Sequence, residues 1–151
     1  MEQLKIRNKA TLQHLHNNIL PKLATSIHNN LTAITPLFHN FELSIIVDTR
    51  TKGPEADADT SISIENGNVQ QMGLRLRLEG FQKAGAPPFD VTKDLLFKLG
   101  YTSYEVSTGK DIAGEERSYD QNWTKQDMEE LAGRWSEELV DDIMQRLADL
   151  T

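Results

Sequence analysis

The first part of the chain carries a helical hydrophobic repeat. Its apolar residues recur between positions 3 and 35 at intervals of three, four or eight, which places them on one face of a helix. This stripe contains Leu4, Leu12, Leu15, Ile19, Leu23, Ile27, Leu31 and Ile34. Pro21 interrupts it, because a proline inside a helix lacks the N–H that would donate to the preceding turn. We therefore expect either one helix kinked at Pro21 or two helices, and Asn17 and Asn18, as potential caps of a break, favour two.

Three later segments alternate between apolar and polar residues, as half-buried strands do. The first spans residues 41–47, the second is centred on Ile62 and Ile64, and the third spans residues 72–78. Between the last two, the sequence Asn-Gly-Asn at 66–68 is typical of a hairpin turn. We therefore predict that the second and third segments pair as a β-hairpin.

Two arginines in the third strand acquire partners if this hairpin has a three-residue loop. Such a loop keeps the apolar residues of both strands on one face, and a two-residue turn followed by a β-bulge gives the same facing. In this register Asp59 lies opposite Arg75, and Asp57 lies opposite Arg77. Opposite charges paired across strands contribute about 0.2–1 kcal/mol each. We therefore interpret both arginines as part of the sheet rather than as a nucleic-acid reader.

The middle of the chain contains three further predicted segments. Residues 90–99 predict a short helix, with Asp90 as its N-cap and Gly100 just past its end. Residues 101–107 predict a fourth strand, and the polar residues 108–122 predict a loop.

The final helix has the clearest pattern in the chain. Its apolar stripe contains Met128, Leu131, Trp135, Leu139, Ile143, Leu147 and Leu150. Thr124 and Asp127 resemble a capping box at its start, and Trp123 has the spacing of a hydrophobic staple with Met128. The whole pattern predicts one α+β domain spanning residues 1–151. In it, a three- or four-stranded antiparallel sheet has its apolar face covered by long N-terminal helices and a long C-terminal helix.

Charge is unevenly distributed along the 151 residues, whose formal net charge is -7. Residues 1–52 hold six Lys/Arg against three Asp/Glu, whereas residues 53–151 hold ten against twenty. An acidic surface disfavours general nucleic-acid binding, because the phosphate backbone requires a cationic patch. The same surface permits a basic protein partner.

Several other classes of site and location are disfavoured. The absence of cysteine excludes a disulfide framework, a thiolate zinc site and a cysteine nucleophile. No apolar run approaches the roughly 18 residues of a membrane span, and the N-terminus lacks a signal-peptide pattern, so we expect a cytoplasmic protein with no membrane contact. His14 and His16 would lie about 200° apart around a helix, and the acidic segment 55–59 lacks the spacing of a calcium loop. We therefore expect neither a metal nor a cofactor.

One enzymatic alternative remains open. A metal-dependent hydrolase or nuclease needs an aspartate at a strand end, together with a glutamate and a lysine on a neighbouring strand. Asp48 ends the first predicted strand, and Glu79 and Lys83 follow the third, so these three form the candidate catalytic set. Phosphate-binding loops, dinucleotide fingerprints and nucleophile elbows are absent from the sequence.

The polar face of the final helix carries the candidate partner-binding residues. They are Glu130, Glu137, Glu138, Asp141 and Asp142. This face is either a solvated surface with i,i+4 pairs, such as Glu130–Arg134 and Asp142–Arg146, or a docking strip for a cationic protein. We expect a non-enzymatic, acidic protein-binding domain. In size, charge and absence of a catalytic motif it resembles bacterial immunity proteins, which inhibit toxins, and also secretion chaperones.

Overall fold

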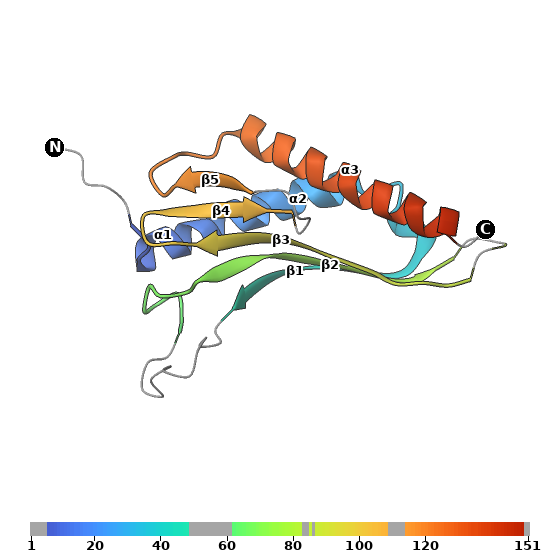
Figure 1. The fold of residues 1–151 in the computed structure, drawn as a ribbon, viewed down its shortest axis with the longest axis horizontal. Helices are drawn as coiled ribbons and strands as arrows, with labels where there is room; N and C mark the ends of the chain where they lie inside the picture. The colour runs from blue at the N-terminus through green and yellow to red at the C-terminus, as the bar shows by residue number, and fades with distance from the viewer. Residues whose placement is uncertain (1–5, 49–61, 83–84, 86, 109–113, 150–151) are drawn as a thin grey trace.

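The chain folds as an α+β protein with a five-stranded antiparallel sheet and helices on one of its faces (Figure 1). The computed structural model describes residues 6–48, 62–82, 85, 87–108 and 114–149. The strands are β1 (Phe38–Asp48), β2 (Gln71–Phe81), β3 (Val91–Leu99), β4 (Ser103–Ser107) and β5 (Glu115–Ser118). Their spatial order equals their sequence order, so each strand pairs with the one that follows it in the chain.

The N-terminal stripe forms one helical path, so the prediction of several helices is wrong. It comprises α1 (Lys9–His14), the π-helical η1 (Leu15–Ile19) and α2 (Leu20–Asn30), followed by a short 3-10 turn, η2 (Thr35–Leu37). Right-handed helical angles continue through both junctions, and the N–H of Leu20 donates to the carbonyl of Leu15, five residues back. The wider turn thus precedes Pro21, which lies in the first turn of α2. Asn17 and Asn18 therefore lie within the path and cap no break.

The predicted helix at 90–99 is instead strand β3. Its buried residues alternate along the strand, and the chain pairs with β2 on one side and β4 on the other. Two residues hide this alternation in the sequence, because Lys93 occupies a buried position and Leu96 lies on the outer face. Asp90, the predicted cap, accepts a hydrogen bond from the N–H of Gly80 at 2.9 Å and so links the ends of β2 and β3.

The predicted hairpin partner of β2 is also wrong. Ile62 and Ile64 lie in coil and turn, while β1 and β3 occupy the two sides of β2. Arg75 faces Asp94 of β3 and makes a two-point ion pair, with distances of 2.9 Å (Nε–Oδ1) and 3.0 Å (Nη2–Oδ2). Arg77 lies 3.6 Å from Glu79 on its own strand. Asp57 and Asp59, the predicted partners, lie outside the described residues.

The C-terminal third confirms two predictions and corrects one. The fourth strand is β4, and the final helix is α3 (Lys125–Asp149), 25 residues long. Its capping box is present: Thr124 and Asp127 each accept a hydrogen bond from the other's backbone N–H, both at 3.0 Å. The predicted loop at 108–122, however, contains β5, whose residues Glu115–Ser118 are all polar and therefore show no hydrophobic alternation. The sheet consequently has five strands rather than the predicted three or four.

The core lies between one face of the sheet and the helices α2 and α3, which also contact each other. Met72, Leu74, Leu76 and Leu78 of β2 are all fully buried in it. From α3, Trp135 is fully buried and donates its indole N–H to the carbonyl of Asp94 at 3.2 Å. Within the described residues, no helix combines the length and the apolar composition that a bilayer crossing requires.

Candidate functional site

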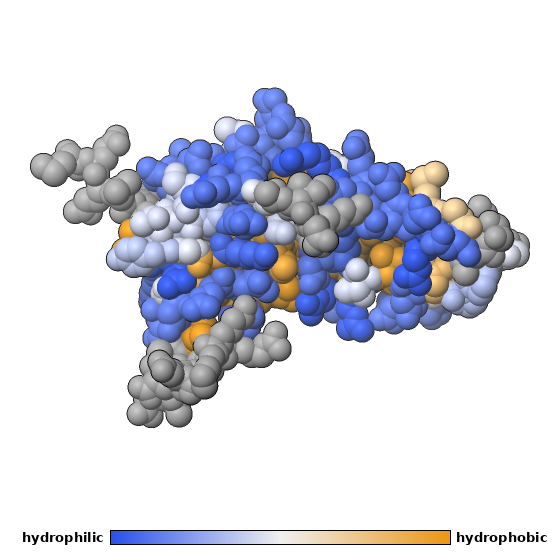
Figure 2. Space-filling model, in the orientation of Figure 1, coloured by the Kyte–Doolittle hydropathy of each residue, from blue (hydrophilic) through white to orange (hydrophobic). Residues whose placement is uncertain are grey.

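Three of the predicted partner-binding residues form an exposed row along α3. Glu130, Glu137 and Asp141 lie at positions i, i+7 and i+11, which places them within about 40° of one another around the helix. We call these three residues the acidic row. Hydrophilic residues cover most of the molecular face seen in Figure 2, including the surface over α3. Among the described residues, Glu137 and Asp141 have no cationic partner, whereas Glu130 accepts a hydrogen bond from Gln126 at 3.0 Å.

The other two predicted residues, Glu138 and Asp142, turn toward the sheet. Their carboxylates lie 3.5 and 3.6 Å from the Nζ atom of Lys93, whose side chain is only 8% exposed. Lys93 also donates to the carbonyl of Thr108 at 3.3 Å, and its ammonium lies 5.8 Å from the centre of the Trp135 ring. A buried ammonium requires such compensation for its lost hydration. Glu138 and Asp142 therefore attach α3 to β3 as well as adding negative charge to the helix.

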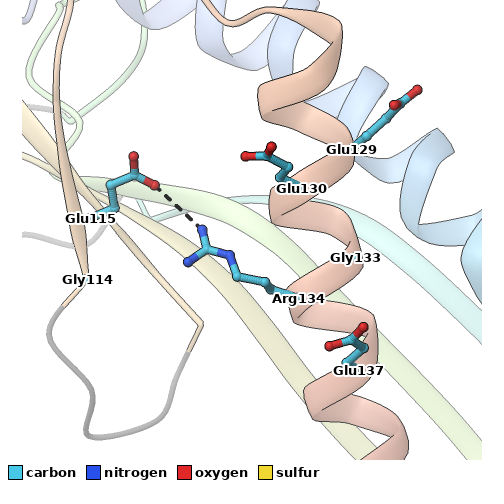
Figure 3. Close-up of a pocket in the computed structure, with 7 residues that line it drawn as sticks. All are labelled: Gly114, Glu115, Glu129, Glu130, Gly133, Arg134 and Glu137. Atoms are coloured by element: carbon cyan, nitrogen blue, oxygen red, sulfur yellow. Dashed lines mark ion pairs between the residues drawn. The ribbon is translucent and has the colours of Figure 1, made fainter.

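A surface hollow lies beside the acidic row, between α3 and the start of β5 (Figure 3). Its volume is about 630 Å³, and it is lined by Gly114, Glu115, Glu129, Glu130, Gly133, Arg134 and Glu137. Arg134 reaches across it to Glu115, with 3.6 Å between Nη2 and Oε2. The space beside Gly133 is open, since a methyl group there would meet no atom within 4 Å. The carboxylates of Glu115, Glu130 and Glu137 and the guanidinium of Arg134 thus face a cavity that a side chain can enter, whereas the side chain of Glu129 points away from it (Figure 3).

A second, smaller hollow extends this surface along α3. It measures about 360 Å³, and it shares Gly133 and Glu137 with the first hollow while adding Asp141. The acidic row therefore borders both hollows. An arginine or lysine side chain placed there would meet carboxylates from successive turns of one helix.

A cluster around Arg117 holds β5 against the start of α3. The guanidinium of Arg117 lies 3.9 Å from the centre of the Trp123 ring, donates to the carbonyl of Asn122 at 3.2 Å, and lies 3.7 Å from Asp127. Hydrogen bonds from Thr124, then the charge of Arg117, hold the pKa of Asp127 below its usual value. Glu115 lies between Arg117 (3.9 Å) and Arg134 (3.6 Å). This cluster fixes the wall of the larger hollow.

Two tyrosines complete the packing behind this wall. Trp123 donates its indole N–H to the hydroxyl of Tyr104 at 2.7 Å, and burial raises the pKa of Tyr104. Tyr119 donates to the carbonyl of Gly100 at 2.6 Å, and burial raises the pKa of Tyr119 to about 12. The hydrophobic pattern missed Glu115 and Arg117, because both inner-face positions of β5 hold charged residues.

The residues of the enzymatic alternative do not converge. Asp48 pairs with Gln71 at one end of β2, whereas Glu79 pairs with Asn40 near the other end. Eight residues separate Gln71 from Glu79, a distance of about 26 Å along a strand. Lys83 lies outside the described residues. Across the described part of the chain, no three carboxylate or histidine side chains gather as a metal site would require.

Comparison of the chain with protein-family models, with curated proteins and with solved structures finds no match.

Proposed function

We propose that this chain is a non-enzymatic, cytoplasmic protein-binding domain that recognises a basic surface through α3. The observation that carries this proposal is the hollow between β5 and α3, where three glutamate carboxylates outnumber one arginine beside the acidic row. The partner's lysine or arginine side chains would enter this hollow and its smaller neighbour. An inhibitor of the immunity type, or a chaperone, is the class of protein that this arrangement favours.

The rigid attachment of α3 favours a role for its acidic face in partner binding rather than as an ordinary solvated surface. Lys93 ties the middle of α3 to the sheet, and the capping box and Arg117 hold its first turn. A partner that docks here would therefore order few of the protein's own groups, which lowers the entropic cost of association. The carboxylates of Glu137 and Asp141, free of any described cation, remain available for pairing.

Charge attraction of this kind has a defined experimental signature. Complementary charges mainly accelerate association, and salt weakens them, because the Debye length falls from about 10 Å at 0.1 M to about 3 Å at 1 M. We expect the association rate to fall as ionic strength rises, with a smaller change in the dissociation rate.

The test begins by capturing binding proteins from the native host at low and moderate salt, and by purifying the protein that is retained. Its affinity is then measured by calorimetry for the wild-type chain and for the variant Glu130→Gln/Glu137→Gln/Asp141→Asn. The matched control, Glu65→Gln/Glu105→Gln/Asp120→Asn, removes the same charge from exposed sites elsewhere. We expect at least a tenfold weaker affinity for the first variant only. Failure to retain any specific protein, or equal losses in both variants, would overturn the proposal.

A further inference from the structure

Strand β1 forms a long edge of the sheet and leaves apolar residues partly uncovered. It contains 11 residues, and within the part of the chain that the structure describes it has a strand neighbour, β2, on one side only (Figure 1). Its inner-face residues Phe41, Leu43, Ile45 and Val47 are only half-buried. Their partners across the ladder on β2 are all fully buried. Although α2 contacts β1, with His28 against Phe41, the helices cover the apolar face of the sheet only partly at this edge.

Strand β1 lacks most of the features that usually protect an edge strand, and of these it has only two charged residues, Glu42 and Asp48. Natural edges are guarded by lysine, proline, bulges or short length, since free N–H and C=O groups would otherwise recruit another strand. Strand β1 contains neither lysine nor proline, and its register with β2 is unbroken from Asn40 to Asp48. The opposite edge, β5, has four residues, three of them charged. Only β1 therefore has the properties of an interface.

The sequence of β1 suits pairing with an antiparallel copy of itself. In an antiparallel ladder, the residue numbers of each directly opposite pair add to the same total, which defines the register. Opposite residues share a face, and the inner-face residues all have odd numbers, so they meet one another only if this total is even. A total of 88 sets Phe41 opposite Val47 and Leu43 opposite Ile45, which matches all four apolar residues. A total of 86 sets Val47 opposite His39, and a total of 90 leaves Phe41 opposite Thr49.

Charge selects the same register independently. Strand β1 carries two carboxylates, Glu42 and Asp48, and neither lysine nor arginine. A total of 90 would place Glu42 opposite Asp48 twice in the dimer, and like charges directly opposite are destabilising. A total of 88 instead sets Glu42 opposite Ile46 and Asp48 opposite Asn40.

We propose that β1 is the interface of a homodimer, in which two copies pair antiparallel about a twofold axis at Ser44. The two five-stranded sheets then join into one continuous sheet, and each copy covers the half-buried apolar residues of the other. This inference is independent of the acidic row, which lies on α3 and remains free in the dimer.

A single cysteine tests the register, because the chain has none of its own. Cα atoms of directly opposite residues lie about 4.5–5.5 Å apart, within the range that a disulfide spans. Ser44→Cys should therefore give a disulfide-linked dimer upon mild oxidation. Glu42→Cys or Ile46→Cys alone should not, since equivalent residues would lie about 13 Å apart. A mixture of these two variants should give the cross-linked heterodimer.

Controls separate pairing from random collision and from misfolding. Thr32→Cys, exposed on the turn after α2, reports the rate of chance cross-linking, and circular dichroism verifies that each variant folds. Analytical ultracentrifugation of the wild-type chain should show a dimer, and Ile46→Lys should shift it toward monomer while retaining the fold. A wild-type chain that is monomeric at all concentrations, or cross-linking of Ser44→Cys no faster than Thr32→Cys, would overturn the proposal. So would capture of β1 by a strand of another protein while the chain stays monomeric.

Discussion

Replacement of Lys93 by methionine should show how firmly the two inward carboxylates attach α3 to the sheet. The change removes the ammonium that lies 3.5 Å from Glu138 and 3.6 Å from Asp142, while it preserves most of the buried side-chain volume. Breaking a fully buried pair costs about 3–5 kcal/mol. Here the carboxylates retain 24% and 43% exposure, so water compensates for part of the loss. We therefore expect the free energy of unfolding to fall by about 2 kcal/mol.

Urea denaturation of a mutant set measures this effect. For a chain of this size, about 2 kcal/mol corresponds to a melting temperature about 4–8 °C lower. Adding Glu138→Gln and Asp142→Asn to Lys93→Met should restore most of the stability, because no carboxylate is then left without a cation. The control Arg77→Met breaks an exposed pair and should change stability by less than about 0.5 kcal/mol. The reasoning would be refuted if the triple variant lost as much stability as the sum of the losses caused by the separate changes.

Two further predictions concern glycine packing and tyrosine ionisation. Gly73→Ala should lower the free energy of unfolding by at least about 2 kcal/mol, since its methyl carbon would lie 2.0 Å from the carbonyl oxygen of Leu95. The methyl group of Gly133→Ala would lie in open space on α3, so this change should raise the free energy of unfolding by about 1 kcal/mol. Similar effects of the two glycine replacements would contradict the packing seen here. In a spectrophotometric titration, Tyr119 should ionise at about pH 12, and Tyr119→Phe should remove that phase. Burial raises the pKa of Tyr119 above its ordinary value of 10.0, so its contribution to the free energy of unfolding is complete below pH 10 and is lost as the pH rises toward 12. Ionisation of Tyr119 near pH 10 would show that its side chain is not buried.

The acidic face of α3 shows where helical periodicity is informative and where it is not. Spacing alone places Glu130, Glu137 and Asp141 on one exposed stripe, as the structure shows. It cannot show that Glu138 and Asp142 turn inward, because that depends on Lys93, which is 45 residues before Glu138 in the chain. The larger hollow likewise needs Glu115 from β5, a strand without hydrophobic alternation.

The arginines of β2 follow the same logic. Alternation correctly placed Arg75 on the outer face of a strand, but the predicted hairpin register assigned it the wrong acidic partner. The partner is Asp94 of β3 rather than Asp59, because the segment after β2 forms a strand, and that strand occupies the side of β2 not paired with β1. Because Lys93 lies at an inner position and Leu96 at an outer one, the sequence of this strand lacks clear alternation and was predicted to form a helix.

The sequence by itself determined the α+β class, the start and stripe of α3, the strands β1, β2 and β4, and the acidic character of the surface. These features follow from periodicity, capping and composition, which act over a few residues or are summed over the chain. Only the tertiary structure decided that residues 91–99 form a strand, that Arg75 pairs with Asp94, and that Lys93 divides the acidic residues of α3 into an inner pair and an outer row. Each of these depends on which distant segments pack together, and burial can outweigh local preference wherever a neighbouring strand or helix supplies the partner.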